Sequence, residues 1–158
     1  ISSYLNYRPN ATFTAGCNGI WSIPCDIALP CATQNEIDGD AARLLIKNGV
    51  KFVAEGANMP SDLEAINEFL ANDVYFGPAK AANAGGVATS ALEMSQNSGR
   101  TSWTFTEVDE KLQEIMHSIY AQSKEAAEKY GFAGNLVVGS NIAGFVKVAD
   151  GLVSEGVY

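Results

Sequence analysis

Three short segments carry the side chains with the most useful chemistry. They are residues 31–36 (CATQNE), 55–60 (EGANMP) and 80–90 (KAANAGGVATS). Each segment combines amide or hydroxyl side chains with small residues that let a ligand approach the backbone. An asparagine side chain offers both a donor and an acceptor, so it suits an amide or a ribose as its partner. The three segments therefore indicate a site that binds a small polar molecule.

An ordinary structural role stays open for each segment, because Asn, Thr and Gly are common turn and cap residues. The pair Gly85-Gly86 is harder to explain in this way. Each glycine inside a helix costs about 1 kcal/mol relative to alanine, which suggests close contact of the backbone with a ligand or another helix. The charged candidates are Asp26, Glu55 and Lys80, whose ordinary roles would be helix caps and ion pairs.

The cysteines give little support for thiol or metal chemistry. Cys17, Cys25 and Cys31 are odd in number and form no Cys-x-x-Cys pair, and His117 lies far from them in the sequence. This pattern is neither a disulfide framework nor a zinc site. We expect three reduced, mostly buried thiols and a histidine on a helix face. A small thiol enzyme that uses Cys31 is a minor alternative.

Apolar runs of strand length alternate with helical patterns in the first half of the chain. The runs cover residues 25–31, 51–57 and 74–79, with a weaker candidate at residues 11–15. Strands alternating with amphipathic helices of about ten residues are typical of βαβ units, which form a parallel sheet with right-handed crossovers. The sequence therefore predicts an α/β fold with three to four parallel strands.

Cap residues predict where the helices between these strands begin. Asp38 or Asp40 can cap the first helix, and Gly49 ends it. Ser61 is the candidate N-cap of the second helix, with Glu64 at the spacing of a capping box.

The strand pattern stops at Lys80, and only helices are expected beyond it. A helix rich in small residues covers residues 80–98 and ends at Gly99. Thr106 is the candidate N-cap of the next helix, and a last helix is expected over residues 135–157.

The predicted sheet lacks the opening of a complete dinucleotide-binding domain. Such a domain normally starts with a strand, a glycine-rich turn and a helix, and no G-x-G-x-x-G follows any strand here. We therefore predict a partial Rossmann-like sheet followed by a helical segment. Residues 1–100 would be the second half of a dinucleotide-binding domain, and residues 101–158 would be a helical extension that packs elsewhere.

Composition excludes several other classes. The 158 residues include 10 Lys and Arg against 18 Asp and Glu, a formal charge of −8. This balance argues against a nucleic-acid partner, which needs clustered basic residues. No uninterrupted run of about 18 apolar residues exists, so no membrane span is expected. The first ten residues lack the order of a signal peptide, which favours a cytoplasmic location.

Four sequence strings together resemble one enzyme family. In chain order they are DIALPCATQNE, VAEGANMP, PAKAANAGGVATS and NIAGFVKVADG. They resemble the carboxy-terminal part of hexameric glutamate dehydrogenases of the bacterial and fungal type. The resemblance is collinear from about Trp21 to Tyr158 and covers most of the chain. It implies that the helices of residues 101–158 pack toward the family's substrate domain, and that the start at Ile1 is a cut in a longer protein.

The resemblance implies a role for individual residues at the cofactor and substrate sites. Ala32 and Thr33 would lie along the dinucleotide, Asn58 would contact the nicotinamide ribose, and Asn83 would face the nicotinamide amide. Val87 would pack on the methylene groups of glutamate, and Ser90 would bind its side-chain carboxylate. NADP is the expected cofactor, with NAD as the alternative.

The resemblance also implies what this chain does not supply. The family's lysine cluster, catalytic aspartate and glycine-rich turn match no segment of the sequence. The family reaction is the reversible oxidative deamination of L-glutamate to 2-oxoglutarate and ammonia. We therefore expect the complete protein to be a hexameric enzyme and the 158-residue chain alone to be inactive. The alternative is a non-catalytic nucleotide-binding or assembly fragment.

Overall fold

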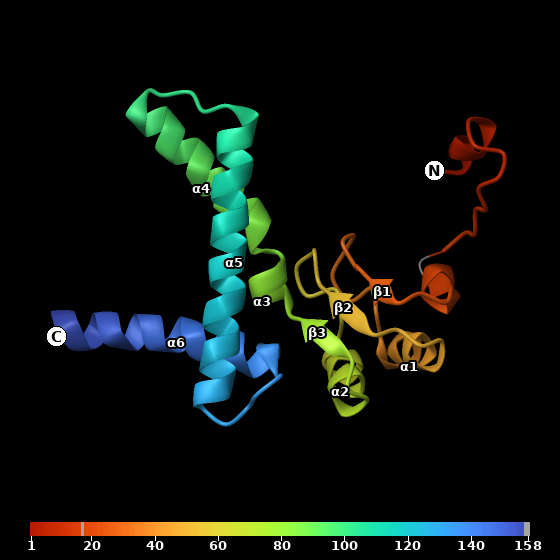
Figure 1. Cartoon of the computed structure of the whole chain (residues 1–158). Helices are drawn as coiled ribbons and strands as arrows, with labels where there is room; N and C mark the ends of the chain where they lie inside the picture. Colours follow the sequence, from red (N-terminus) through yellow and green to blue (C-terminus); the bar gives the residue numbers. More distant parts are fainter. Residues whose placement is uncertain (17, 157–158) are drawn as a thin grey trace.

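The centre of the fold is a parallel sheet of three strands in the order β1-β2-β3. A computed structural model describes residues 1–16 and 18–156. The strands are β1 (Ile27–Ala28), β2 (Phe52–Ala54) and β3 (Tyr75–Gly77) (Figure 1). The predicted α/β class is confirmed, although each strand is shorter than its apolar run. The candidate fourth strand at residues 11–15 is wrong, because a short stretch of suitable composition forms no strand without a neighbour to pair with.

The helix α1 (Gly39–Lys47) follows β1 and begins at Asp38, one of the two predicted caps. The Asp38 carboxylate accepts a hydrogen bond of 2.8 Å from the Ala41 backbone N–H. The helix ends at Asn48, and Gly49 follows with a positive φ of 90°. A glycine is suited to that backbone conformation, so the predicted end of this helix is confirmed.

The helix α2 (Leu63–Ala71) begins one residue later than its predicted cap. Asp62 is the N-cap, and its carboxylate accepts a hydrogen bond of 2.7 Å from the Ala65 backbone N–H. Ser61 is instead fully buried and pairs with Ile37 in an isolated parallel bridge. Ser61, which the local sequence pattern favours as the cap, thus pairs with Ile37, and Asp62 caps the helix in its place.

One face of the sheet forms the core. Ala28, Val53 and Phe76 lie in register across the three strands and are all buried. They pack against α1 and α2, which lie side by side on that face of the sheet (Figure 1). The Phe69 ring of α2 stacks on Phe76 with 5.7 Å between ring centroids. Burial of this apolar row is the main stabilising contribution to the sheet layer.

The other face of the sheet carries a second apolar row. Ile27, Phe52 and Tyr75 lie in register and are 57%, 45% and 67% exposed. Phe52 and Tyr75 stack with 5.2 Å between ring centroids. These two rings border a groove whose opposite wall includes Met116 and Tyr120 of the long helix described below. The sheet therefore has a packed face and a largely uncovered face.

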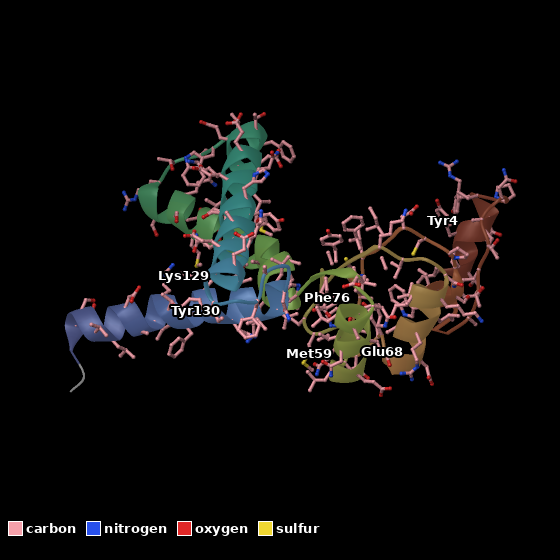
Figure 2. The ribbon with its side chains drawn as sticks, turned by 60° about the horizontal axis from the view of Figure 1, so that its bottom comes forward. Tyr4, Met59, Glu68, Phe76, Lys129 and Tyr130 are labelled. Carbon is pink, nitrogen blue, oxygen red and sulfur yellow. The ribbon has the colours of Figure 1, made fainter. Side chains whose placement is uncertain are left out.

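A charged cluster on the surface joins α1 to α2. Arg43 of α1 donates to Asp40 at 2.7 Å and to Glu64 and Glu68 of α2 at 2.8 Å each. Glu68 is labelled in Figure 2, where α1 and α2 adjoin. These hydrogen bonds, first the one that Arg43 donates to Asp40, raise the pKa of Arg43 above its ordinary value. Because most of these side chains are exposed, the cluster contributes little to stability.

The second half of the chain is helical, as predicted. Its helices are α3 (Ala79–Ala82), α4 (Ala84–Gly99), α5 (Phe105–Lys129) and α6 (Leu136–Glu155). In Figure 1, α4 packs near the start of α5, and α6 crosses α5 near its other end. The single helix predicted over residues 80–98 is broken at Asn83. Two 3-10 helices, Ser2–Asn6 and Asn18–Ser22, precede the sheet.

Thr104, two residues before the predicted cap, begins α5. Its side chain accepts from the Glu107 backbone N–H at 3.3 Å, and the Glu107 carboxylate accepts from the Thr104 backbone N–H at 2.7 Å. This is a complete capping box, whereas Thr106 lies inside the helix. The Thr104 backbone N–H, followed by its hydroxyl, lowers the pKa of Glu107.

The capping box gives a first testable expectation. Thr104→Ala should lower the free energy of unfolding by about 1 kcal/mol, because the first turn of α5 loses its side-chain acceptor. The pKa of Glu107 is lower in the folded chain than in the unfolded chain. The stabilisation that ionised Glu107 provides should therefore be complete above the ordinary glutamate pKa and should be lost as the pH falls through the lowered pKa. Urea unfolding of both proteins at a series of pH values checks this. An effect of Thr104→Ala that stays constant into the acid range would contradict the coupling.

The helix α6 bears on the expectation that the chain has no membrane span. It is long and apolar enough to cross a membrane by length and composition alone, although no uninterrupted apolar run occurs in it. Phe145, Val148 and Leu152 lie along one exposed side of the helix. A single helix of this kind is weak evidence for a membrane span, because helices that pack inside proteins share its composition.

Candidate functional site

The carboxyl ends of the strands bring the first two polar segments together. The Asn35 backbone N–H donates to the Met59 carbonyl at 3.0 Å, and the Gly56 N–H donates to the Pro30 carbonyl at 2.9 Å. Segments 31–36 and 55–60 therefore lie side by side at one edge of the sheet. This edge is where parallel α/β sheets bind their ligands.

Two of the predicted cofactor residues are in direct contact. The Asn83 side-chain Nδ2 donates to the Asn58 Oδ1 atom at 2.8 Å and to the Ala57 carbonyl at 2.9 Å. Asn58 follows β2, and Asn83 lies between α3 and α4, after β3. Both hydrogens of the Asn83 amide are thus engaged, so its Oδ1 atom is oriented as an acceptor.

Buried Glu55 lines the same cavity as these two asparagines. Glu55 follows the end of β2 and is only 2% exposed. One carboxylate oxygen accepts from the Ser61 backbone N–H at 3.0 Å, and the other accepts from the Ala79 backbone N–H at 2.7 Å. The expected role of Glu55 as a helix cap or ion-pair residue is met in its first form, because Ala79 is the first residue of α3 and its N–H is one of the two donors. Both carboxylate oxygens are satisfied by backbone groups.

Backbone strain accompanies the two loops at this edge. Asn35 and Met59 both adopt a left-handed conformation, with φ values of 54° and 50°. Such conformations are uncommon for residues other than glycine and gather at ligand-binding positions. Met59 is labelled in Figure 2, close to α2. Sequence reasoning missed both features, because neither residue type signals a positive φ reliably.

The other predicted cofactor residues lie on the same edge but outside this contact. Ala32 and Thr33 are exposed in the segment after β1. The Ala32 backbone N–H donates to a Glu36 carboxylate oxygen at 3.0 Å, which closes the segment into a turn. Their exposure leaves the backbone of this turn accessible to a ligand.

The predicted substrate residues lie on the first turns of α4. Val87 is 71% exposed, and Ser90 is exposed with its hydroxyl donating to the Gly86 carbonyl at 3.2 Å. A Cβ atom added at Gly86 would meet no described atom within 4 Å, and one at Gly85 would make only ordinary contacts. The predicted close approach to Gly85-Gly86 is therefore not made by a described helix of this chain.

The remaining charged candidates have different partners. Lys51 donates to Asp26 at 2.7 Å, as an ordinary ion pair would. This hydrogen bond lowers the pKa of Asp26 and raises that of Lys51. Lys80 donates to the Asn141 Oδ1 atom of α6 at 2.6 Å. The residues are 61 positions apart, so no local pattern could have found this contact.

A cavity of about 390 Å³ lies between the loop after β2, α3 and the start of α6. Its polar wall is formed by Asn58, Lys80, Asn83, Ser140 and Asn141.

Within residues 1–16 and 18–156, no three His, Cys, Asp or Glu side chains gather to hold a metal ion. Cys25 and Cys31 are free thiols, as expected, but Cys25 is half-buried and Cys31 is exposed, so the expectation that they are buried is wrong. Cys17 lies outside the described residues.

Parallel strands with polar loops at their carboxyl ends are the arrangement by which doubly wound α/β proteins bind nucleotides. The comparisons with known proteins make this class specific. A family model for glutamate/leucine/phenylalanine/valine dehydrogenases matches residues 1–156. The chain belongs to this family.

Individual relatives agree with the resemblance found in the sequence. The chain is 60% identical over 140 residues to an NADP-specific glutamate dehydrogenase of Salmonella typhi, covering 87% of this chain and 30% of the relative. It is 49% identical over 158 residues to an NAD-specific glutamate dehydrogenase of Bacteroides fragilis, covering 99% of this chain and 35% of the relative. The resemblance to glutamate dehydrogenases is thereby confirmed.

Solved structures give the same result. The chain superposes on the crystal structure of Plasmodium falciparum glutamate dehydrogenase with a TM-score of 0.95 at 50% identity, covering 100% of this chain and 34% of that one. The chain therefore spans about a third of the length of the relatives that it matches.

Proposed function

We propose that the chain is part of a glutamate dehydrogenase, to which it contributes contacts with the cofactor and the substrate. The observation that carries the proposal is the Asn83–Asn58 hydrogen bond of 2.8 Å at the carboxyl ends of parallel strands. NADP is the proposed cofactor because the Salmonella typhi relative is NADP-specific, and NAD is the alternative because the Bacteroides fragilis relative is NAD-specific.

The residues at the edge of the sheet fit a nicotinamide dinucleotide. Asn83 presents its Oδ1 atom as an acceptor, which suits the N–H groups of a carboxamide. Asn58 is exposed beside it and can bind a ribose hydroxyl. Ala32 and Thr33 offer an accessible backbone along which the dinucleotide would extend.

The substrate side of the site is proposed on α4. Val87 and Ser90 are exposed there, so they can pack on the methylene groups of glutamate and bind its side-chain carboxylate. When bound, the cofactor accepts the hydride from the α carbon of glutamate. The residues of this chain bind and orient the reactants, and the lysine and aspartate that move protons would come from the rest of the protein.

We propose that two surfaces of the chain contact the rest of that protein. Residues 1–100 form the second half of the dinucleotide-binding domain, and residues 101–158 pack toward the substrate domain. The exposed apolar side of α6, formed by Phe145, Val148 and Leu152, supports the second part. The hexameric assembly is proposed from the family resemblance.

A chimaera tests the proposed function. The matching 140-residue stretch of the Salmonella typhi relative would be replaced by this chain's sequence. We expect the chimaera to reduce NADP in the presence of glutamate, and the 158-residue chain alone to give no turnover. A folded but inactive chimaera would contradict the proposal, and so would turnover by the isolated chain above the level of a contaminating full-length enzyme.

The alternative is a non-catalytic nucleotide-binding or assembly fragment. The Asn83–Asn58 pair favours it, because the pair forms within this chain alone. Calorimetric titration of the 158-residue chain with NADP and NAD distinguishes a nucleotide-binding module from an inert piece. Micromolar binding without turnover would favour the binding module over an inert piece.

A further inference from the structure

The position of Glu55 suggests more than a structural role. Its carboxylate is buried at the end of β2, where an unpaired charge would be strongly unfavourable. The Ser61 and Ala79 backbone N–H groups bind one oxygen each, at 3.0 and 2.7 Å. Hydrogen bonds to an ionised acceptor are stronger than neutral ones and fix the acceptor's orientation. The Glu55 carboxylate therefore links the loop after β2 to the start of α3, in addition to the hydrogen bonds of the Asn83 side chain.

The two segments are those that carry the asparagine pair. Ser61 closes the loop that begins at Glu55 and contains Asn58. Ala79 is the first residue of α3, and Asn83 is the residue that ends this short helix. The Asn83 backbone N–H donates to the Ala79 carbonyl at 3.0 Å, so the two ends of α3 move together.

The backbone of Glu55 adds a third connection. Its N–H donates to the Gly77 carbonyl at 3.0 Å, which extends the β2–β3 pairing to the last residue of β3. Only Pro78 separates Gly77 from Ala79. The main chain and side chain of Glu55 thus both hold the end of β3 and the start of α3 against the loop after β2.

We infer that Glu55 is a positioning residue that sets the separation of Asn58 and Asn83. One carboxylate anchors the segments of both asparagines, so removing its charge should loosen the 2.8 Å contact between them. Its importance for the cofactor rests on the proposed function. The effect on the asparagine pair itself does not, because that pair lies within this chain.

The first test uses Glu55→Gln in the 158-residue chain. Glutamine keeps the shape, but its amide group places a donor against a backbone donor. Hydrogen exchange of the Asn83 side-chain amide, followed by ¹⁵N–¹H NMR, should accelerate roughly tenfold to a hundredfold, as expected for loss of a buried hydrogen bond to a charged group. Unchanged exchange at Asn83, with accelerated exchange at the Ser61 and Ala79 amides, would overturn the inference. Glu64→Gln, the same change at an exposed glutamate, is the matched control and should leave Asn83 unchanged.

A second variant decides the matter if Glu55→Gln does not fold. Ala79→Pro removes only the N–H group that donates to Glu55, and proline is well tolerated at the first position of a helix. Pro78 already has an extended ψ of 150°, which suits a residue that precedes proline. We expect faster exchange at the Asn83 side chain here also, though smaller than for Glu55→Gln. Exchange equal to that of the unmodified chain would overturn the inference.

The consequence for the cofactor is measured in the active chimaera. Glu55→Gln should raise the KM for NADP at least tenfold, while the KM for glutamate changes less than twofold, because Val87 and Ser90 lie on α4. Parallel changes in both constants would show a merely structural role and overturn this part. If the chimaera with native Glu55 is inactive, the proposed function fails, whereas the NMR result on the 158-residue chain still decides whether Glu55 positions the pair.

Discussion

Replacing Gly139 with alanine is expected to release α6 from α5. Gly139 is the one buried residue of α6 and lies where the two helices cross. A Cβ atom there would overlap the Ser123 carbonyl oxygen and lie 2.9 Å from the Ala127 Cβ atom. Overpacking of a fitted contact costs about 1–3 kcal/mol when side chains can shift, and a backbone carbonyl shifts less readily. The helices must therefore separate.

A glycine on the same helix provides the control. A Cβ atom at Gly144 would meet nothing within 4 Å. Gly144→Ala should stabilise α6, because alanine favours a helix by about 1 kcal/mol over glycine. Hydrogen exchange across residues 136–155 compares the two variants. Protection should fall in Gly139→Ala and rise in Gly144→Ala, and equal protection in both would contradict the steric account.

The release of α6 would also reach the candidate site. Asn141 of α6 accepts from Lys80, and Ser140 forms part of the cavity wall beside Asn58 and Asn83. The Lys80 side chain would lose its 2.6 Å partner when α6 moves away. The contact between Lys80 and Asn141, which are far apart in the sequence, thus depends on the close crossing of α5 and α6 at Gly139.

The sequence predicted the elements of the fold better than their ends. Strands were found because parallel strands carry apolar residues on both faces and so form continuous apolar runs, although here the row of Ile27, Phe52 and Tyr75 is largely exposed. The caps at Ser61 and Thr106 were wrong by one and two residues, because aspartate or threonine lies close to each of these positions. In such cases the tertiary structure decides which residue becomes the cap, as the buried bridge between Ser61 and Ile37 shows.

The candidate site was predictable in part. The segments with Asn58 and Asn83 were found because polar loops follow the carboxyl ends of parallel strands, and these ends share one edge. Glu55 was singled out as a cap or ion-pair candidate, but the two backbone N–H groups that it binds could not be predicted, because no side-chain pattern records them. The roles of Ala32, Thr33, Val87 and Ser90 remain predictions from the family resemblance.

Replacing Phe69 with alanine is expected to remove a large part of the stability of the sheet layer. The Phe69 side chain is fully buried and stacks on Phe76 of β3. Its carbonyl also accepts from the Val74 backbone N–H at 3.0 Å, where the chain turns from α2 into β3. Truncation of a buried phenylalanine costs about 3–5 kcal/mol, compared with a total of about 5–15 kcal/mol for a typical domain.

Urea unfolding measures this effect, with Phe105→Ala as the control. Phe105 is 87% exposed, so the same change should alter the midpoint little. Because Phe76 lies on the strand that leads to Asn83, loss of its cover should also speed exchange of the Asn83 side-chain amide. A large fall in stability with unchanged exchange at Asn83 would mean that the edge of the sheet is held by Glu55 and its backbone partners independently of the core row.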